Sequence, residues 1–169
     1  MPKKAPPSFA AYALPTEHLA AMGDVVFKWG RLEYQISVLI SECFEIPIET
    51  GRVFMHNAQI SKLCGLLKSA TATDHWIKDE TLRKEIGSFA DAVNEKRNDR
   101  HGVAHALIGF NLASPDDYYR YNFASVKTKI SPATELVSVI DLASKATVAG
   151  KFVSSAVELL TRLQALRRK

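Results

Sequence analysis

The chain has too few cysteines for a disulfide framework or a cysteine-rich metal site. Its 169 residues contain two, Cys43 and Cys64, with no CxxC spacing, and both are expected to be reduced thiols that pack as small hydrophobic side chains. The longest apolar runs, such as residues 36–40, are far shorter than the ~20 residues of a membrane-spanning helix. The N-terminus lacks the apolar stretch of a secretory signal, so the expected location is the cytoplasm.

Several familiar signatures of catalysis are also missing. The sequence has no glycine-rich phosphate loop, no GxSxG nucleophile elbow and no paired CxxC, which are the usual signs of P-loop nucleotide hydrolysis, serine hydrolysis and zinc-ribbon sites. His101 and His105 have the i, i+4 spacing that can bind zinc on a helix, but no cysteine, third histidine or HExxH glutamate accompanies them. The sequence therefore predicts no metal and no small-molecule cofactor.

The charge balance is mildly basic. The 22 Lys and Arg residues against 18 Asp and Glu give a net charge of +4 and a pI of about 9.1. Part of the excess lies at the two ends of the chain, and part lies at Lys96, Arg97 and Arg100. Such a balance permits an anionic partner such as RNA without requiring one.

Length and composition predict one globular domain preceded by a short arm. Hydrophobic residues make up 47% of the chain and charged residues 24%, a globular composition, and the length suits one well-packed domain. Prolines between small residues in 1–15 predict a flexible, extended N-terminal arm. Residues 16–169 then form a single helical domain.

Apolar residues recur every three to four positions through most of this domain, as in amphipathic helices. The pattern predicts a first helix that opens at Thr16 and is broken by Pro47, a second over 49–70, a third that Asp79 caps, and a last one that starts at 131–132. The apolar faces are expected at Val25, Val26, Trp29, Leu32, Ile36, Leu39, Ile40 and Cys43; Val53, Phe54, Ile60, Leu63, Leu66 and Leu67; Leu82, Ile86, Phe89, Ala90 and Val93; and Leu136, Ile140, Ala143, Val148, Phe152, Leu159, Leu160 and Leu163.

The periodicity of the apolar residues changes between the third and the last of these helices. Residues 106–112 and 118–128 are rich in aromatic and β-branched residues and flank the polar stretch 114–117, which is the pattern of a hairpin with a turn at 114–117. The expected fold is therefore mostly α, an antiparallel bundle of four to five helices with one small β-hairpin before the last helix.

The residues with the most chemical potential lie at the end of the third predicted helix. At 100° per residue, Asn94, Asn98, His101 and His105 share one helix face, and Arg97 flanks it; Arg100 lies in the same stretch. Cations beside two groups that titrate near neutrality are suited to phosphate chemistry. A polar contact between helices uses the same residue types, so both interpretations stay open.

Arg97 also continues the apolar stripe of its helix, four residues after Val93. Glu33 lies within the apolar arc of the first helix, between Trp29 and Ile36. Because an isolated buried charge is very costly, these two positions predict a buried Glu33–Arg97 ion pair that sets the register of the two helices.

The cluster resembles the R-polar-x(4–6)-H signature of the HEPN superfamily (higher eukaryotes and prokaryotes nucleotide-binding domains). Arg97-Asn98 followed after six residues by His105 fits it, and Arg100-His101 with His105 fits it in a shorter register. The wider pattern is similar to a bacterial group of uncharacterised HEPN-like proteins, in which a first helix carrying W-x2-L-E, here residues 29–33, precedes an R-N-x(n)-H helix and a small hairpin. The resemblance covers about residues 22–165.

The resemblance implies a homodimer that brings two Arg/His motifs together at a composite cleft. In catalytic members this cleft is a metal-independent endoribonuclease site, found in toxins and antiviral effectors. His105 would be the general acid or base, and Arg97 or Arg100 would stabilise the charge on phosphate, with Asn98, His101 and Glu33 in support. Apolar residues on the last helix, Phe152, Leu159, Leu160 and Leu163, favour a dimer as well.

Two functions therefore stay open. The first is a HEPN-type ribonuclease, which two histidines beside two arginines favour. The second is a non-catalytic HEPN-like module that dimerises or binds RNA or protein through the same face, which the position of Arg97 in an apolar stripe favours.

Overall fold

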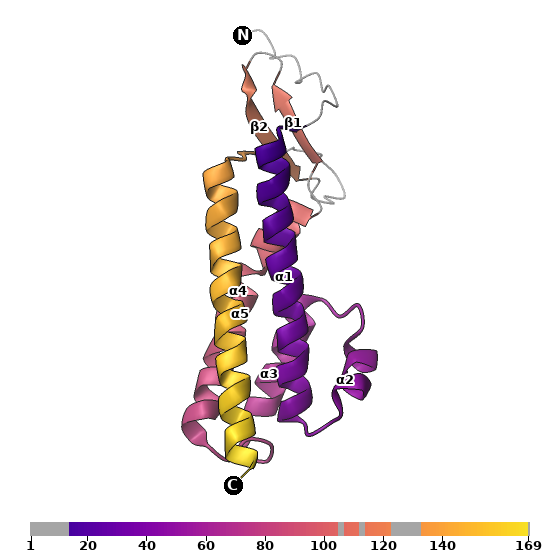
Figure 1. Cartoon of the computed structure of the whole chain (residues 1–169), viewed down its shortest axis with the longest axis vertical. Helices are drawn as coiled ribbons and strands as arrows, with labels where there is room; N and C mark the ends of the chain where they lie inside the picture. The colour runs from indigo at the N-terminus through magenta and orange to yellow at the C-terminus, as the bar shows by residue number, and fades with distance from the viewer. Residues whose placement is uncertain (1–13, 105–106, 112–113, 123–132, 169) are drawn as a thin grey trace.

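Helices α1 (Thr16–Cys43), α3 (Ile60–Thr71), α4 (Glu80–Ala104) and α5 (Val139–Arg167) lie side by side in the computed structural model (Figure 1). The structure describes residues 14–104, 107–111, 114–122 and 133–168. A fifth helix, α2 (Ile48–Met55), stands beside the end of α1. The expected helical bundle is thus confirmed. All but the last two residues of the predicted N-terminal arm lie outside the described residues.

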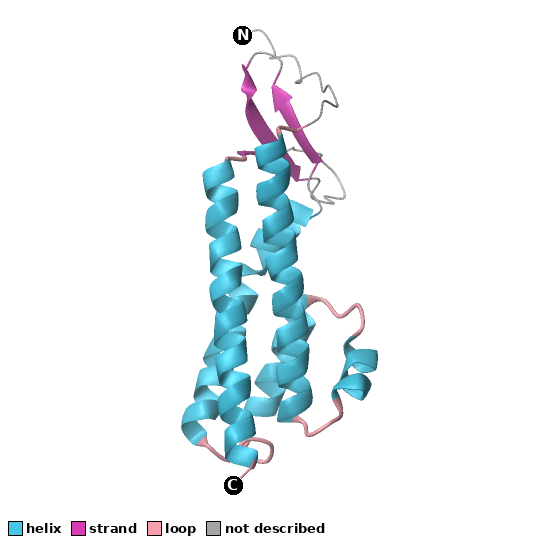
Figure 2. Cartoon of the chain, in the orientation of Figure 1, coloured by secondary structure: helices cyan, strands magenta, loops and turns pink. Residues whose placement is uncertain are grey.

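The helices are not all antiparallel to their neighbours. Lys28 lies beside Gly150, and Glu42 Oε2 is 3.3 Å from Gln164 Nε2, so α1 and α5 run in the same direction. The expectation of an antiparallel bundle is wrong for this pair. The reason is the number of reversals: α4 runs opposite to α1, and α5 runs opposite to α4, since Glu85 pairs with Arg162 and Phe89 meets Phe152. A β-sheet connects α4 to α5 at one end of the bundle (Figure 2).

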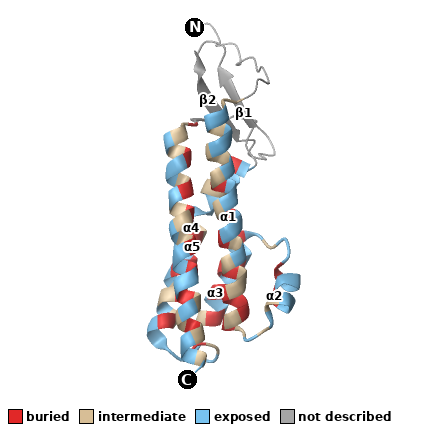
Figure 3. Cartoon of the chain, in the orientation of Figure 1, coloured by how far each residue is buried: buried red, intermediate tan, exposed pale blue. Residues whose placement is uncertain are grey.

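The core is built mainly from the faces that the 3–4 periodicity predicts (Figure 3). Every predicted apolar residue of α4 is buried, and on α1 only Val26 is exposed among those predicted. Asp79 caps α4 as expected, since its Oδ1 accepts from the backbone N–H of Leu82 at 2.7 Å. These contacts follow directly from burial of one apolar stripe per helix.

The last helix differs from its prediction at both its start and its face. It begins at Val139, after Ser138, whose side chain accepts from Asp141 N at 3.0 Å, and not at residues 131–132. Ile140 is 83% exposed. The buried face is Leu142, Ala146, Ala149, Val153, Ala156, Leu159 and Leu163.

The apolar surplus from which we predicted a homodimer is used within the chain. Leu159 and Leu163 are buried in the core, Leu160 packs against it, and Phe152 meets Phe89 edge-to-face with 6.1 Å between ring centroids. These residues therefore do not point to a dimer surface.

The predicted second helix, 49–70, is in fact two helices. Residues 56–59 separate α2 from α3, and Asn57 has a positive φ of 59°, a conformation that asparagine tolerates better than most residues. Val53 and Phe54 of α2 are both exposed and do not join the core. The break turns the chain so that α3 begins beside the last turns of α4.

The segment between α4 and α5 holds three strands in the described ranges, and not an isolated hairpin. Strands β1 (Leu107–Asn111), β2 (Ser114–Asn122) and β3 (Ala133–Leu136) form an antiparallel sheet in the order β1-β2-β3. The predicted turn at 114–117 is wrong, because Asn111 pairs with Ser114. Pro115 is tolerated there because neither β1 nor β3 pairs with residue 115, so no ladder hydrogen bond is lost.

None of the helices in the described ranges combines the length and the low charge needed to cross a membrane.

Candidate functional site

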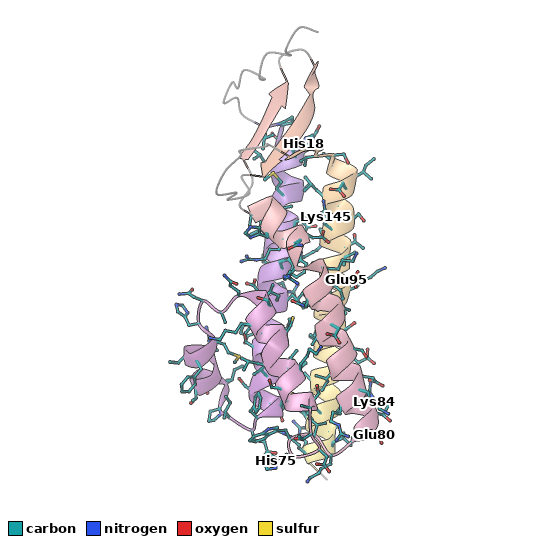
Figure 4. All side chains as sticks on the ribbon, turned by 180° about the vertical axis from the view of Figure 1, so that it is seen from behind. His18, His75, Glu80, Lys84, Glu95 and Lys145 are labelled. Atoms are coloured by element: carbon teal, nitrogen blue, oxygen red, sulfur yellow. The ribbon has the colours of Figure 1, made fainter. Side chains whose placement is uncertain are left out.

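The Arg/His cluster occupies the last turns of α4. The helix continues to Ala104, with Arg97, Asn98 and His101 exposed and Arg100 half-buried. His105 lies outside the described residues. Figure 4 labels Glu95 just ahead of the cluster, and Glu80 and Lys84 at the opposite end of the same helix.

The predicted Glu33–Arg97 pair is wrong: the partner of Glu33 is Arg100. Arg100 Nε lies 3.0 Å from Glu33 Oε1, with the two side chains 33% and 26% exposed. The two groups are in charge contact but are not aligned for a hydrogen bond, since the buried Arg100 Nε has no hydrogen-bond partner. Glu33 therefore attracts the Arg100 side chain to α1, but it leaves the Arg100 Nε–H without a hydrogen-bond acceptor.

Arg97 instead bonds to its own helix. Its Nη1 donates to the backbone oxygen of Asn94 at 2.8 Å and to Asn94 Oδ1 at 3.1 Å. One edge of this exposed guanidinium is thereby fixed. Nε and Nη2 make no hydrogen bond within the part of the chain that the structure describes, and a guanidinium offers five donors in all.

Burial raises the pKa of the Glu33 carboxyl above its ordinary value, and the charge of Arg100 opposes that rise. Burial is the larger of the two effects. The carboxylate is therefore retained in a place where its own charge is unfavourable. Such positions are more frequent at functional sites than elsewhere.

A cavity of about 340 Å³ separates the cluster from the start of α3. We call it the α3–α4 pocket. It is lined by Gln59, Ile60, Ser61, Arg97, Asn98, Arg100 and His101. The expected cationic and hydrogen-bonding side chains of α4 are thus brought together on one wall, and the opposite wall is the N-terminal end of a helix.

That helix end is electropositive and uncapped. The first turn of α3 contains no acidic residue, and the side chain of Gln59 makes no capping hydrogen bond. Gln59 O accepts from Lys62 and Leu63, so the N–H groups of Ile60 and Ser61 remain for another acceptor. A helix N-terminus of this kind favours an anion, and two arginines face it across the pocket.

A second cavity, of about 380 Å³, lies on the other side of Arg100. We call it the α1–α3 pocket. Its walls come from α1, the end of α2, the break between α2 and α3, α3 and α4. The lining residues are Glu33, Tyr34, Ser37, Met55, Asn57, Ala58, Gln59, Leu63 and Arg100. Because Arg100 and Gln59 line both cavities, the two pockets are neighbours with a shared wall.

The residue types of the α3–α4 pocket suit an anion better than a cation. Among residues whose side chains the structure describes, no group of three or more His, Cys, Asp or Glu is placed to hold a metal ion.

Comparison with models of protein families, with curated proteins and with solved structures finds no match for this chain. The chemistry of the site is set by its arginines and its N–H donors.

Sequence reasoning gave a functional role to five of the fourteen residues that line the two pockets and missed the other nine. The periodicity predicts a continuous helix through Gln59, Ile60 and Ser61, and it indicates no role for Tyr34 or Asn57. The available signal was Asn57, a residue type that accepts a left-handed backbone and often marks a break.

Proposed function

We propose that this chain is a metal-independent, HEPN-type endoribonuclease whose α3–α4 pocket holds the RNA phosphate that is cleaved. The observation that carries the proposal is the meeting of Arg97, Arg100 and His101 with the uncapped start of α3. A phosphodiester fits this arrangement because guanidinium groups and helix N-termini both bind phosphate well. The HEPN resemblance and the +4 net charge agree with an RNA substrate.

The proposed reaction is an internal transesterification. The ribose 2′-oxygen attacks phosphorus and gives its proton to a histidine, the bond from phosphorus to the 5′-oxygen breaks, and that oxygen takes a proton from an acid. The products are a 2′,3′-cyclic phosphate and a 5′-hydroxyl. His105 is the proposed proton carrier, and arginine stabilises the charge that grows on the phosphoryl oxygens.

We further propose that the active form is a homodimer. Transesterification needs one group to accept a proton and another to donate one, and the resemblance implies that two Arg/His motifs meet at a shared cleft. Two copies of His105 would then supply both. The mass in solution at micromolar concentration, measured by light scattering, tests this directly: a monomer would contradict it.

A non-catalytic RNA-binding module remains the second candidate. The observation that favours it is that both arginines are already engaged, Arg100 with Glu33 and Arg97 with Asn94. The guanidinium donors that face Asn94 and Glu33 are not available to a phosphate, so fewer donors remain to stabilise charge that grows in a transition state. In this case the chain would bind RNA and leave it intact.

The test is incubation of the purified protein with a single-stranded RNA in EDTA. Cleavage is expected to persist in EDTA, to leave 2′,3′-cyclic phosphate ends and to follow a pH profile set by histidine. Arg97→Ala, Arg100→Ala and His105→Ala should each lower the rate, the last by about 100-fold or more. Binding should weaken as salt rises, because phosphate contacts release counterions.

Matched controls lie at the far end of the bundle. Lys84→Ala removes a cation from the same helix, and His75→Ala removes an exposed histidine; both should cleave like wild type. If His105→Ala cuts as fast as wild type, the catalytic proposal fails. RNA binding that depends on Arg97 and Arg100 without cleavage would establish the second candidate.

A further inference from the structure

The α1–α3 pocket contains a half-buried carboxylate that can still accept hydrogen bonds. Glu33 is 26% exposed and its Oε1 lies 3.0 Å from Arg100 Nε, and its carboxylate accepts no hydrogen bond within the part of the chain that the structure describes. A carboxylate has about four acceptor sites, so the ion pair with Arg100 leaves capacity for further donors. A ligand with N–H donors in the pocket would use it.

The surroundings of Glu33 fit a flat, polar, aromatic ligand. Tyr34 is half-exposed at 49% and offers a ring on the pocket wall. Asn57 and Gln59 line the same pocket, and their carboxamides make no hydrogen bond with the residues that the structure describes. A volume of about 380 Å³ is at the small end of ligand pockets, which suits a single nucleobase. Bases of unpaired RNA are bound in this way, by stacking on an aromatic ring and by bonds to the base edge.

We infer that the α1–α3 pocket binds a guanine base, with the phosphate of its nucleotide across Arg100 in the α3–α4 pocket. Guanine carries two adjacent donors, N1–H and the N2 amino group, which match the two oxygens of Glu33 in a bidentate contact. Adenine, cytosine and uracil each place an acceptor next to their donor on this edge, so one carboxylate oxygen would face a lone pair. A site built around a polar contact rejects ligands that leave it unpaired.

The shared wall explains how both parts of one nucleotide could be held. Base and phosphate are joined through a single ribose, so their sites must be neighbours, and Arg100 and Gln59 line both pockets. This inference rests on the proposed function, because a nucleobase is expected here only if the adjoining α3–α4 pocket binds the phosphate of RNA. Its own test therefore uses ligands that carry no phosphate.

The experiment is equilibrium dialysis of guanosine, adenosine, cytidine and uridine against the full chain. Guanosine is expected to bind at least about tenfold more tightly than the other three nucleosides. Glu33→Gln should bring all four affinities within about twofold of each other. Tyr34→Ser should weaken all four by a similar factor, because stacking does not depend on base identity.

Phe27→Ala is the matched control, since Phe27 is an exposed aromatic on the same helix that does not line the pocket. It should keep the guanosine preference. Equal affinities of wild type for the four nucleosides would overturn the base site, and this result does not depend on whether any variant folds. A guanosine preference unchanged in a folded Glu33→Gln protein would overturn it as well.

The two proposals fail in different ways. Guanosine preference without RNA cleavage in EDTA would support the base site and contradict the ribonuclease. Cleavage at all four bases alike, with no guanosine preference, would support the ribonuclease and contradict the base site. Where both hold, cleavage should occur beside guanosine and lose that selectivity in Glu33→Gln.

Discussion

Removing either member of the Glu33–Arg100 pair should have unequal effects on stability. Burial raises the pKa of Glu33 more than Arg100 lowers it, so the charged carboxylate is a net cost to the fold at neutral pH. Arg100→Gln leaves that carboxylate without its cation and should destabilise. Glu33→Gln removes the buried charge and leaves an arginine that is one-third exposed, so it should be close to neutral.

The magnitude follows from the geometry of the pair. Two unit charges 3.0 Å apart attract by about 1.4 kcal/mol in bulk water and by about 5.5 kcal/mol at an effective dielectric constant of 20. Exposed pairs contribute about 0–1 kcal/mol, whereas breaking a buried pair costs about 3–5 kcal/mol. With both side chains partly exposed, we expect about 1–2 kcal/mol for Arg100→Gln and about 0.5 kcal/mol or less for Glu33→Gln.

The effect of Arg100→Gln should depend on pH. Below the ordinary glutamate pKa of 4.5, Glu33 is protonated in both the folded and the unfolded state, and the loss of Arg100 costs little. As pH rises through the raised pKa of the folded state, the folded protein must carry the buried charge and stability falls relative to wild type. The difference between variant and wild type should therefore grow from acidic to neutral pH.

The assay is urea unfolding of wild type, both single variants and the double variant, with Arg97→Gln as the matched alternative. The coupling free energy from the double-mutant cycle should be about 1–2 kcal/mol for Glu33 and Arg100. For Glu33 and Arg97 it should lie within about 0.5 kcal/mol of zero. A larger coupling with Arg97, or a pH-independent cost of Arg100→Gln, would refute the reasoning.

Two further predictions concern the packing of the bundle. Gly51→Ala should destabilise by about 1–3 kcal/mol, because a Cβ there would overlap Ser41 Oγ. Gly65→Ala meets nothing within 4 Å and should stabilise by up to about 1 kcal/mol; equal unfolding midpoints of the two variants would contradict this. Burial raises the pKa of Cys43 to about 12 and that of Cys64 to about 11, so both thiols should react slowly with a disulfide reagent at pH 8 until urea unfolds the chain, and rapid reaction of native protein would count against it.

Periodicity predicted the helices well where one apolar stripe is buried along the whole element. Trp29 and Ile36 on α1, and Ile86 and Val93 on α4, are all fully buried as expected, because hydrophobic burial is decided by spacing within one helix. The partner of Glu33 was predicted less well. Arg97 and Arg100 follow Val93 by four and seven residues, and both spacings return to the same helix face.

The choice between the two arginines depends on how far α4 is displaced along α1. That displacement is set by the packing of the whole bundle, and no pattern within either helix encodes it. Arg97 lies where its side chain can reach back to Asn94, while Arg100, nearly one turn further on, lies level with Glu33. The sequence pattern identifies the charged residues but does not predict which arginine lies level with Glu33.

The same limit applies to the site as a whole. The cations of α4 were visible in the sequence as a cluster, but the opposite wall of the α3–α4 pocket is backbone, and backbone N–H groups carry no sequence signature. They become available only because the chain breaks at 56–59 and begins a new helix at Ile60. Had the helix continued from Val53 through Leu63, the N–H of Ile60 would bond within the helix, and the arginines would face a wall without donors. The proposed phosphate site thus depends on a break between helices that the periodicity of apolar residues did not reveal.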